Sequence, residues 1–332
     1  MLASAVGAQP QPPGTPATPG TPGTAPAAAR VLSLATLAPA GSTWMRGLDA
    51  MNRELRRRTG NAVSFRFYPG GLQGDESEVI RKMRSGRLDS GVFTGTGLSN
   101  IYRPTAAFML PGMFPNQEAM ERARAALAPD IETAFQGEGF TILAWRESGT
   151  PRLFSTQEIR TPTQLRAAHP WQWRDDRILP ALYAEVGASG VPLSLPEVLG
   201  AIQTNRVDTV VAPPLAAVAL QWAQTMRFMS EGANSYGVGG LVMSRRALDT
   251  LTPEQQATLR EVVGQFMGLI GRNAQRDDQA ALTSMTTRGV TAVTYSAAER
   301  QQWADVFTRT RARLVGTICD QPFMDRVRAA GR

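Results

Sequence analysis

The feature that most constrains the fold of this chain is a regular alternation of short strand patterns and amphipathic helix patterns, which begins at Arg30. The patterns predict, in turn, a strand, a helix, a strand, a helix and a strand over 31–36, 44–58, 62–68, 74–84 and 86–93. A β-α-β-α-β order is typical of a mostly parallel sheet with helices on its faces. Ligands of such sheets gather where the strands end, which is predicted here at 36–41, 68–74 and 94–99.

A second α/β pattern follows the apolar segment 140–145. Its predicted helices and strands cover 177–186, 197–204, 207–212 and 240–244. Further on, Thr252 is a predicted helix cap with Pro253 at the first helical position, and the helix that they open extends to about Arg288. Few helices of globular domains are that long, which favours a helix that spans two lobes.

The content of reactive side chains excludes several kinds of site. The chain holds one cysteine, Cys319, and one histidine, His169. A structural disulfide, a zinc site with four Cys or His ligands and a three-histidine metal site are therefore excluded within one chain, and we expect neither a metal nor a cofactor. A serine hydrolase with a histidine base would depend on His169 alone, which we predict to be exposed in a turn. No segment approaches the ~20 unbroken apolar residues of a membrane-spanning helix.

The net charge of +7 comes almost entirely from arginine, because Lys82 is the only lysine. Basic surfaces bind the phosphates of nucleic acids. The arginines of this chain are spread along its length, however. Their one tight run, 56–58, falls late in a predicted helix, where positive charge is favourable to the helix dipole. We therefore expect no nucleic-acid partner.

Residues 1–30 have a composition of their own. They contain no charged side chain before Arg30 and are rich in Pro, Gly and Thr. We expect the first eight residues to be the last part of a signal peptide, with Val6-Gly7-Ala8 as its cleavage site, and the rest to be a disordered tether. The expected location of the mature protein is the periplasm.

Beyond this tether, an ordered set of motifs resembles the DctP-type solute-binding proteins of TRAP (tripartite ATP-independent periplasmic) transporters. Two of them read Ala35-Thr-Leu-Ala-Pro-Ala-Gly-Ser-Thr-Trp44 and Phe67-Tyr-Pro-Gly-Gly-Leu-Gln-Gly-Asp-Glu76, and others cover 81–84, 86–89, 94–99, 191–199, 201–204 and 207–208. The resemblance extends over 31–290. It implies an α/β, two-lobed, periplasmic-binding-protein-like fold, with a mostly parallel sheet in each lobe, a long lobe-spanning helix and the ligand between the lobes. It also implies a receptor, not an enzyme, that delivers a small organic molecule to the membrane subunits of a permease driven by an ion gradient.

The resemblance sets expected boundaries for the parts of the chain. After the tether over 1–30, the first lobe comprises 31–146 and about 238–255, the second comprises 147–237 and about 289–332, and the long helix over about 253–288 joins them. The two crossover segments, near 145–148 and 236–240, are the expected hinge on which the lobes close.

One departure from the family pattern is chemically important. Most members clamp a carboxylate with an arginine of the second lobe, at a position that falls on Trp171 here. The segment Pro170-Trp-Gln-Trp-Arg-Asp-Asp176 instead resembles a subgroup with a Trp-x-Trp motif. An indole cannot replace a bidentate guanidinium, so we expect a cleft without a buried guanidinium. We also expect a ligand with more apolar surface than is usual for the family, stacked on Trp173 and Trp171, with Arg174 as the candidate for a shifted clamp.

Eight residues are the candidate ligand contacts: Trp44, Gln73, Thr94, Thr96, Trp171, Trp173, Arg174 and Tyr236. Other roles are open for most of them. The two tryptophans of the Trp-x-Trp motif can be core residues, Trp44 can pack its own helix, and the two threonines can belong to a plain turn. Asp175 and Asp176 can neutralise Arg174. Asp75-Glu76 fits negative charge at a helix start better than an acid–base pair.

Two other functions are compatible with the sequence. A receptor of the same fold can feed a signalling partner instead of a permease. A periplasmic hydrolase with paired carboxylates needs neither histidine nor cysteine, but its candidates Asp175, Asp176 and Asp208 all belong to one expected lobe.

Overall fold

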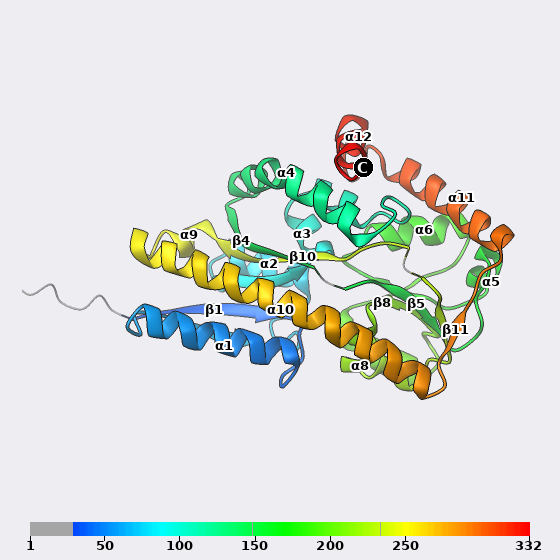
Figure 1. Ribbon diagram of the computed structural model, residues 1–332, viewed down its shortest axis with the longest axis horizontal. Helices are drawn as coiled ribbons and strands as arrows, with labels where there is room; N and C mark the ends of the chain where they lie inside the picture. The colour runs from blue at the N-terminus through cyan, green and yellow to red at the C-terminus, as the bar shows by residue number, and fades with distance from the viewer. Residues whose placement is uncertain (1–28, 148, 233) are drawn as a thin grey trace, which may run out of the picture.

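The computed structural model describes residues 29–147, 149–232 and 234–332 (Figure 1). The expected signal-peptide remnant and all but the end of the tether lie outside these residues. Within the described part, no helix combines the length and the apolar character that crossing a bilayer requires.

Two sheets divide the described chain into two lobes (Figure 1). The strands of the first lobe are β1 (Arg30–Thr36), β2 (Val63–Tyr68), β3 (Ser90–Thr94), β4 (Phe140–Glu147) and β10 (Val238–Ser244). Those of the second are β5 (Arg152–Ser155), β6 (Trp171–Trp173), β7 (Val191–Leu193), β8 (Thr209–Ala212), β9 (Phe228–Ser230) and β11 (Thr291–Val293). The sheet orders are β2-β1-β3-β10-β4 and β11-β9-β5-β8, and β6 and β7 form a separate parallel pair. Among the described strands, β10 and β5 run against their neighbours, while the other strands of each sheet point the same way, so both sheets are mixed.

Helices cover both faces of the first sheet. The first-lobe helices are α1 (Thr43–Arg58), α2 (Glu76–Arg84), α3 (Gly95–Ile101), α4 (Gln117–Gly137), α9 (Arg245–Leu248) and the 3₁₀ helix η1 (Arg103–Met109). On one face α1 packs through Met45, Leu48, Met51 and Leu55, which recur at helical spacing, and Ser42 caps its first turn. On the other face α2, α3 and α4 enclose a core around Phe93 and Phe135.

The second lobe has shorter elements around a core rich in tryptophan. Its helices are α5 (Pro162–Arg166), α6 (Ile178–Val186), α7 (Val198–Gln203), α8 (Pro214–Ala219) and α11 (Ala297–Leu314), with the 3₁₀ helices η2 (Leu195–Glu197) and η3 (Trp222–Gln224). Phe154, Trp171, Val210 and Trp222 are buried together in its main core. His169 is exposed in the turn before β6 and lies 3.1 Å from Asp208, consistent with the predicted turn.

The long helix α10 (Pro253–Thr287) joins the lobes, as predicted from its length and its cap (Figure 1). Thr252 and Gln255 form a reciprocal capping box at its start. Its first half packs on α1 and its second half on α8. The chain leaves the first lobe after β4 and returns into β10, and the N–H of Gly237 donates to the carbonyl of Gly149 at 3.0 Å. The two crossover segments therefore lie side by side, where the hinge is expected.

The C-terminal helix α12 (Gln321–Ala330) packs on α4, which belongs to the first lobe (Figure 1). Cys319, Met324 and Val327 are buried in the first-lobe core. The expected boundaries place this segment in the second lobe, whereas α11 alone packs there, on α6. We therefore propose that the second lobe ends near Leu314 and that α12 belongs to the first.

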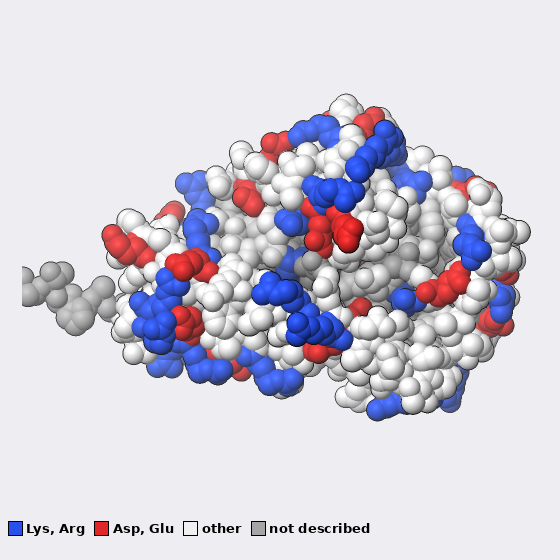
Figure 2. All heavy atoms as spheres, in the orientation of Figure 1, with Lys and Arg blue, Asp and Glu red and all other residues white. Residues whose placement is uncertain are grey.

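Basic and acidic side chains are interspersed on the face shown in Figure 2. The arginine run at the end of α1 illustrates the pattern, because Arg57 pairs with Glu54 and Arg58 with Glu261, each at 2.6 Å. These arginines are thus part of surface ion pairs around the helix end, where their charge also favours the helix dipole.

Candidate functional site

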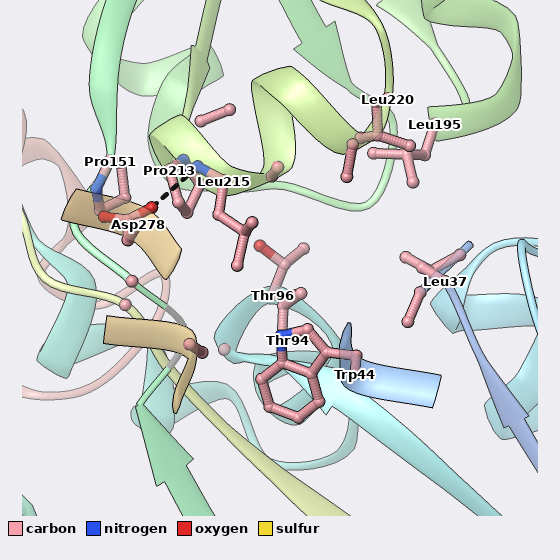
Figure 3. A pocket seen from close by; sticks show the side chains of 18 of the residues that line it. Leu37, Trp44, Thr94, Thr96, Pro151, Leu195, Pro213, Leu215, Leu220 and Asp278 are labelled. Atoms are coloured by element: carbon pink, nitrogen blue, oxygen red, sulfur yellow. Dashed lines mark hydrogen bonds between the residues drawn. The ribbon is translucent and has the colours of Figure 1, made fainter. Parts of the chain in front are cut away.

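A cavity of about 540 Å³ lies between the two lobes. Its walls come from the strand ends of the first sheet, the start of α1, the motif strand β6, the start of α8 and the middle of α10. In Figure 3, Leu195, Leu215 and Leu220 of the second lobe face Leu37, Trp44 and Thr96 of the first across the open space. The two lobes therefore build one shared site.

The ends of parallel strands position the first-lobe wall. Thr36 ends β1, Thr94 ends β3 and Arg146 lies next to the end of β4, and all three line the cavity. Two of the predicted strand-end segments, 36–41 and 94–99, contribute residues to this cavity, and ligand binding there stays a prediction. The third predicted segment, 68–74, does not line this cavity.

Most of the cavity wall is apolar. The apolar side chains include Leu37, Val92, Met109, Pro151, Ile178, Leu179, Leu195, Pro213, Leu215, Val218 and Leu220. Trp171 and Trp173 stack with ring centroids 5.9 Å apart, which confirms that they share a face, and Trp222 meets Trp171 edge-on at 5.2 Å. Trp171 is 3% exposed and its Nε1 donates to the carbonyl of Leu193, so it is a core residue that also closes one side of the cavity.

Arg146 brings a guanidinium to the cavity from the first sheet. Its guanidinium carbon lies 4.3 Å from the centre of the Trp44 ring, a cation–π geometry, and its Nε is shielded from solvent. In the sheet, Gly239 pairs with Arg146 on one side and with Thr94 on the other. A Cβ at Gly239 would lie 2.9 Å from Nε of Arg146, so the arginine crosses β10 where a side chain is missing. The expectation of a cleft without a buried guanidinium is therefore wrong.

Glu76 adds a buried carboxylate beside the same strand end. It is 2% exposed and accepts hydrogen bonds from the N–H of Thr94 at 2.6 Å and from its hydroxyl at 2.7 Å. Burial raises the pKa of Glu76 to about 7, and burial lowers the pKa of Arg146 to about 10, although the charge of each favours the ionised form of the other. Glu76 does lie in the first turn of α2, as predicted, but its carboxylate is bound to β3.

Two further acids of the cavity wall are held by backbone N–H groups. Asp176 accepts from Ile178 at 2.7 Å and from Leu179 at 3.4 Å at the start of α6. Asp278 of α10 accepts from the N–H of Leu215 at 2.9 Å, the contact that is dashed in Figure 3. Burial raises the pKa of both carboxyls. Asp176 thus fixes the start of α6, and Asp278 connects α10 to α8, at the cavity wall.

Six of the eight candidate contacts line the cavity: Trp44, Thr94, Thr96, Trp171, Trp173 and Tyr236. Gln73 and Arg174 lie outside it. The side-chain oxygen of Gln73 accepts from Lys82, and Arg174 is paired with Glu197 at 3.2 Å with more than half of its side chain exposed. Arg174 therefore does not occupy the place of a shifted clamp, although ligand contact by the six lining residues stays a prediction.

The sequence reasoning missed Arg146, Glu76 and Asp278 as wall residues. Arg146 had a usable signal, since it is a charged residue that directly extends the apolar strand pattern 140–145. Asp278 had none, because it is one of several polar residues in the middle of a long helix. Among the described residues, no group of three or more His, Cys, Asp or Glu side chains is arranged to hold a metal ion.

Comparisons with known proteins agree with the geometry. The family model described as bacterial extracellular solute-binding protein, family 7 (DctP), matches residues 34–315. The 2,3-diketo-L-gulonate-binding periplasmic protein YiaO of Escherichia coli (strain K12) is 22% identical over 269 residues, which cover 78% of this chain and 81% of that protein.

Solved structures share the fold. A TRAP periplasmic solute-binding protein from Shewanella oneidensis with bound succinate has a TM-score of 0.85 at 15% identity, over 92% of this chain and 100% of the other. One from Sulfitobacter sp. NAS-14.1 with bound β-D-galacturonate has a TM-score of 0.83 at 18% identity, over 91% and 99%. Because the family model matches most of the chain and the two-lobed fold agrees, this protein belongs to family 7 of the bacterial extracellular solute-binding proteins, the DctP family of TRAP-type receptors, which bind solutes and are not enzymes.

Proposed function

We propose that this protein is the exported solute receptor of a TRAP transporter, and that it delivers a small organic acid with a large apolar body to the membrane subunits of an ion-gradient-driven permease. The observation that carries the proposal is the cavity between the lobes, whose walls are mostly apolar and which the Arg146 guanidinium lines. The acids named for relatives, succinate, galacturonate and 2,3-diketo-L-gulonate, support an acidic ligand.

Arg146 supplies the chemistry that an acidic ligand needs. With a pKa of about 10 it is protonated at neutral pH. A carboxylate loses its hydration when the lobes enclose it, which costs several kcal/mol unless a charged donor replaces the water. A guanidinium does so with two parallel hydrogen bonds. Arg146 thus takes the role of the family clamp from the first lobe, while the clamp position itself is occupied by Trp171.

The apolar walls determine the size and the apolar character of the part of the ligand beyond its carboxylate. A cavity of about 540 Å³ belongs to the size range of sites that enclose drug-sized molecules, which are much larger than a four-carbon dicarboxylate. Trp173, Leu37 and Leu215 offer hydrocarbon surface from both lobes. The proposed ligand is therefore an aromatic or branched-chain acid with its carboxylate at Arg146.

Calorimetric titration tests this ligand class. The panel comprises succinate, galacturonate, 3-phenylpropionate and 4-methyl-2-oxopentanoate, with 3-phenylpropanamide as the uncharged match of one acid. We expect an apolar acid to bind best, and Arg146→Met to weaken that acid at least tenfold while its amide is little affected. Arg174→Met is the matched control and should change neither. Tight binding of succinate that does not depend on Arg146 would overturn the proposed ligand class.

The transport role has its own test. Proteoliposomes that contain the permease subunits from the same organism should accumulate the bound acid when this receptor and an ion gradient are both supplied. Capture of a signalling protein, with no uptake in that assay, would favour the sensory alternative.

A further inference from the structure

The first turn of α2 contacts the second lobe through a carboxylate that points away from its own helix. Asp75 occupies the N-cap position of α2 but makes no side-chain capping hydrogen bond. Its Oδ2 accepts instead from Nε1 of Trp173 at 2.7 Å and from the N–H of Leu195 at 3.2 Å. Both donors belong to the second lobe, so Asp75 crosses the boundary between the lobes.

A carboxylate of the second lobe serves α2 in return. Oδ2 of Asp175, two residues after Trp173, accepts from the N–H of Ser77 at 2.9 Å. Ser77 is the second residue of α2, so this is an N–H that a helix cannot satisfy internally. The backbone carbonyl of Asp175 also accepts from the side chain of Asn100 in α3, at 3.3 Å. The cap of α2 therefore comes from the opposite lobe.

The exchange has a consequence for lobe opening. Separation of the lobes removes the Asp175 cap from Ser77 and the Trp173 donor from Asp75 in one movement. Aspartate is among the best N-cap residues, and Asp75 already has the extended backbone that N-caps adopt, with φ −73° and ψ 171°. After separation the Asp75 carboxylate can therefore rotate and accept from the free N–H groups at the start of α2. Both the carboxylate and these N–H groups then keep a hydrogen-bond partner.

We propose that Asp75 is a partner-switching latch between the lobes: its carboxylate holds Trp173 and Leu195 of the second lobe when the lobes are closed, and caps its own helix α2 when they are open. Trp173 connects the latch to the solute, because the same indole that donates to Asp75 lines the cavity. Asp75 is thus a positioning residue, which fixes the orientation of the indole without lining the cavity itself.

The test measures lobe opening without solute, so its outcome does not depend on the proposed ligand. Spin labels at the exposed residues Arg57 and Gln301, in a Cys319→Ala background, report the distribution of distances between the lobes. Trp173→Phe keeps an aromatic ring and removes the donor. We expect it to raise the ratio of open to closed molecules roughly tenfold, the typical effect of losing a hydrogen bond to a charged group. Hydrogen exchange of the Leu195 amide, which donates to Asp75 across the lobes and loses this partner when they separate, should accelerate in parallel.

Trp303→Phe is the matched control. It removes an indole N–H that donates to the carbonyl of Arg160 inside the second lobe, at a residue that does not line the cavity. The open-to-closed ratio should therefore stay unchanged in this variant. An equal shift in both variants, or no shift in Trp173→Phe, would overturn the latch.

Two substitutions of Asp75 distinguish a carboxylate that changes its partner on opening from one that only holds the closed lobes together. Ala can neither reach Trp173 nor cap α2, whereas Ser is too short for Trp173 but caps a helix well. If Asp75 changes partner, Asp75→Ser stabilises the open state by capping and opens more than Asp75→Ala. Equal opening of the two variants would refute the partner switch. Should either variant fail to fold, the Trp173→Phe and Trp303→Phe pair still decides whether the latch exists.

Discussion

Replacement of Glu76 by glutamine should make the protein more stable at alkaline pH and leave its stability unchanged at acidic pH. Glu76 is 2% exposed, and burial raises its pKa from the ordinary value of 4.5 to about 7. The folded protein therefore keeps a proton that the unfolded chain releases between these two values. Stability is lost as the pH rises through that window, because the ionised carboxylate is disfavoured by its buried site.

The magnitude follows from the same two values. One unit of pKa difference corresponds to about 1.4 kcal/mol, so the loss above pH 7 is about 3 kcal/mol. Glutamine resembles the protonated acid: its carbonyl oxygen can accept from the N–H of Thr94, and its amide can donate to the hydroxyl. In Glu76→Gln the contribution of this site should therefore no longer depend on pH.

Urea unfolding of the two proteins between pH 4.5 and pH 8 provides the measurement. The difference in free energy of unfolding should be near zero at pH 4.5 and reach about 3 kcal/mol in favour of Glu76→Gln at pH 8. Glu78→Gln, at a partly exposed position of the same helix, is the control and should run parallel to the wild type. Parallel curves for Glu76→Gln as well would refute the reasoning, since they would mean that burial does not shift this carboxyl.

Substitutions at three further positions test the packing and the capping of elements that build the site. Gly239→Ala should lower the free energy of unfolding by about 1–3 kcal/mol and weaken acid binding, because the new Cβ would lie 2.5 Å from the carbonyl oxygen of Phe93 and 2.9 Å from Arg146. Gly264→Ala, in an open part of α10, should instead stabilise by about 1 kcal/mol, and urea unfolding of both would show whether space is the cause. Thr252→Ala should cost about 1 kcal/mol through loss of the α10 cap, with recovery in Thr252→Ser; a neutral alanine variant would show that the cap contributes nothing.

Local sequence patterns were enough to define the elements and the class of fold. Strand alternation and helical spacing depend on residues two to four positions apart, so the order of the first three strands and two helices could be read directly, whereas α3 and α4 were not predicted. The long helix was equally local in origin, since Thr252 and Pro253 mark its start and its length follows from an unbroken pattern. Family motifs then supplied the two-lobed architecture, which the structure confirms.

Which charges meet in the cavity depends on the three-dimensional arrangement of the strands. Arg146 reaches the site because β10, from a distant part of the chain, inserts between β3 and β4 and places Gly239 beside the arginine. No local pattern encodes that strand order. Arg174 follows the motif tryptophan directly in sequence, but its partner Glu197 at the surface comes from a separate segment, which the local pattern does not specify either.

Contacts between the lobes were equally beyond local reasoning. Asp75 and Trp173 are 98 positions apart, and each has an adequate local role, as a helix cap and as a strand residue. Closure of the lobes brings the carboxylate and the indole N–H together away from water. A charge-assisted hydrogen bond is stronger there than in water, so the contact with Trp173 is favoured over the capping of α2 by Asp75. The sequence therefore specified the parts of the binding site, and the packing of one lobe against the other selected their partners.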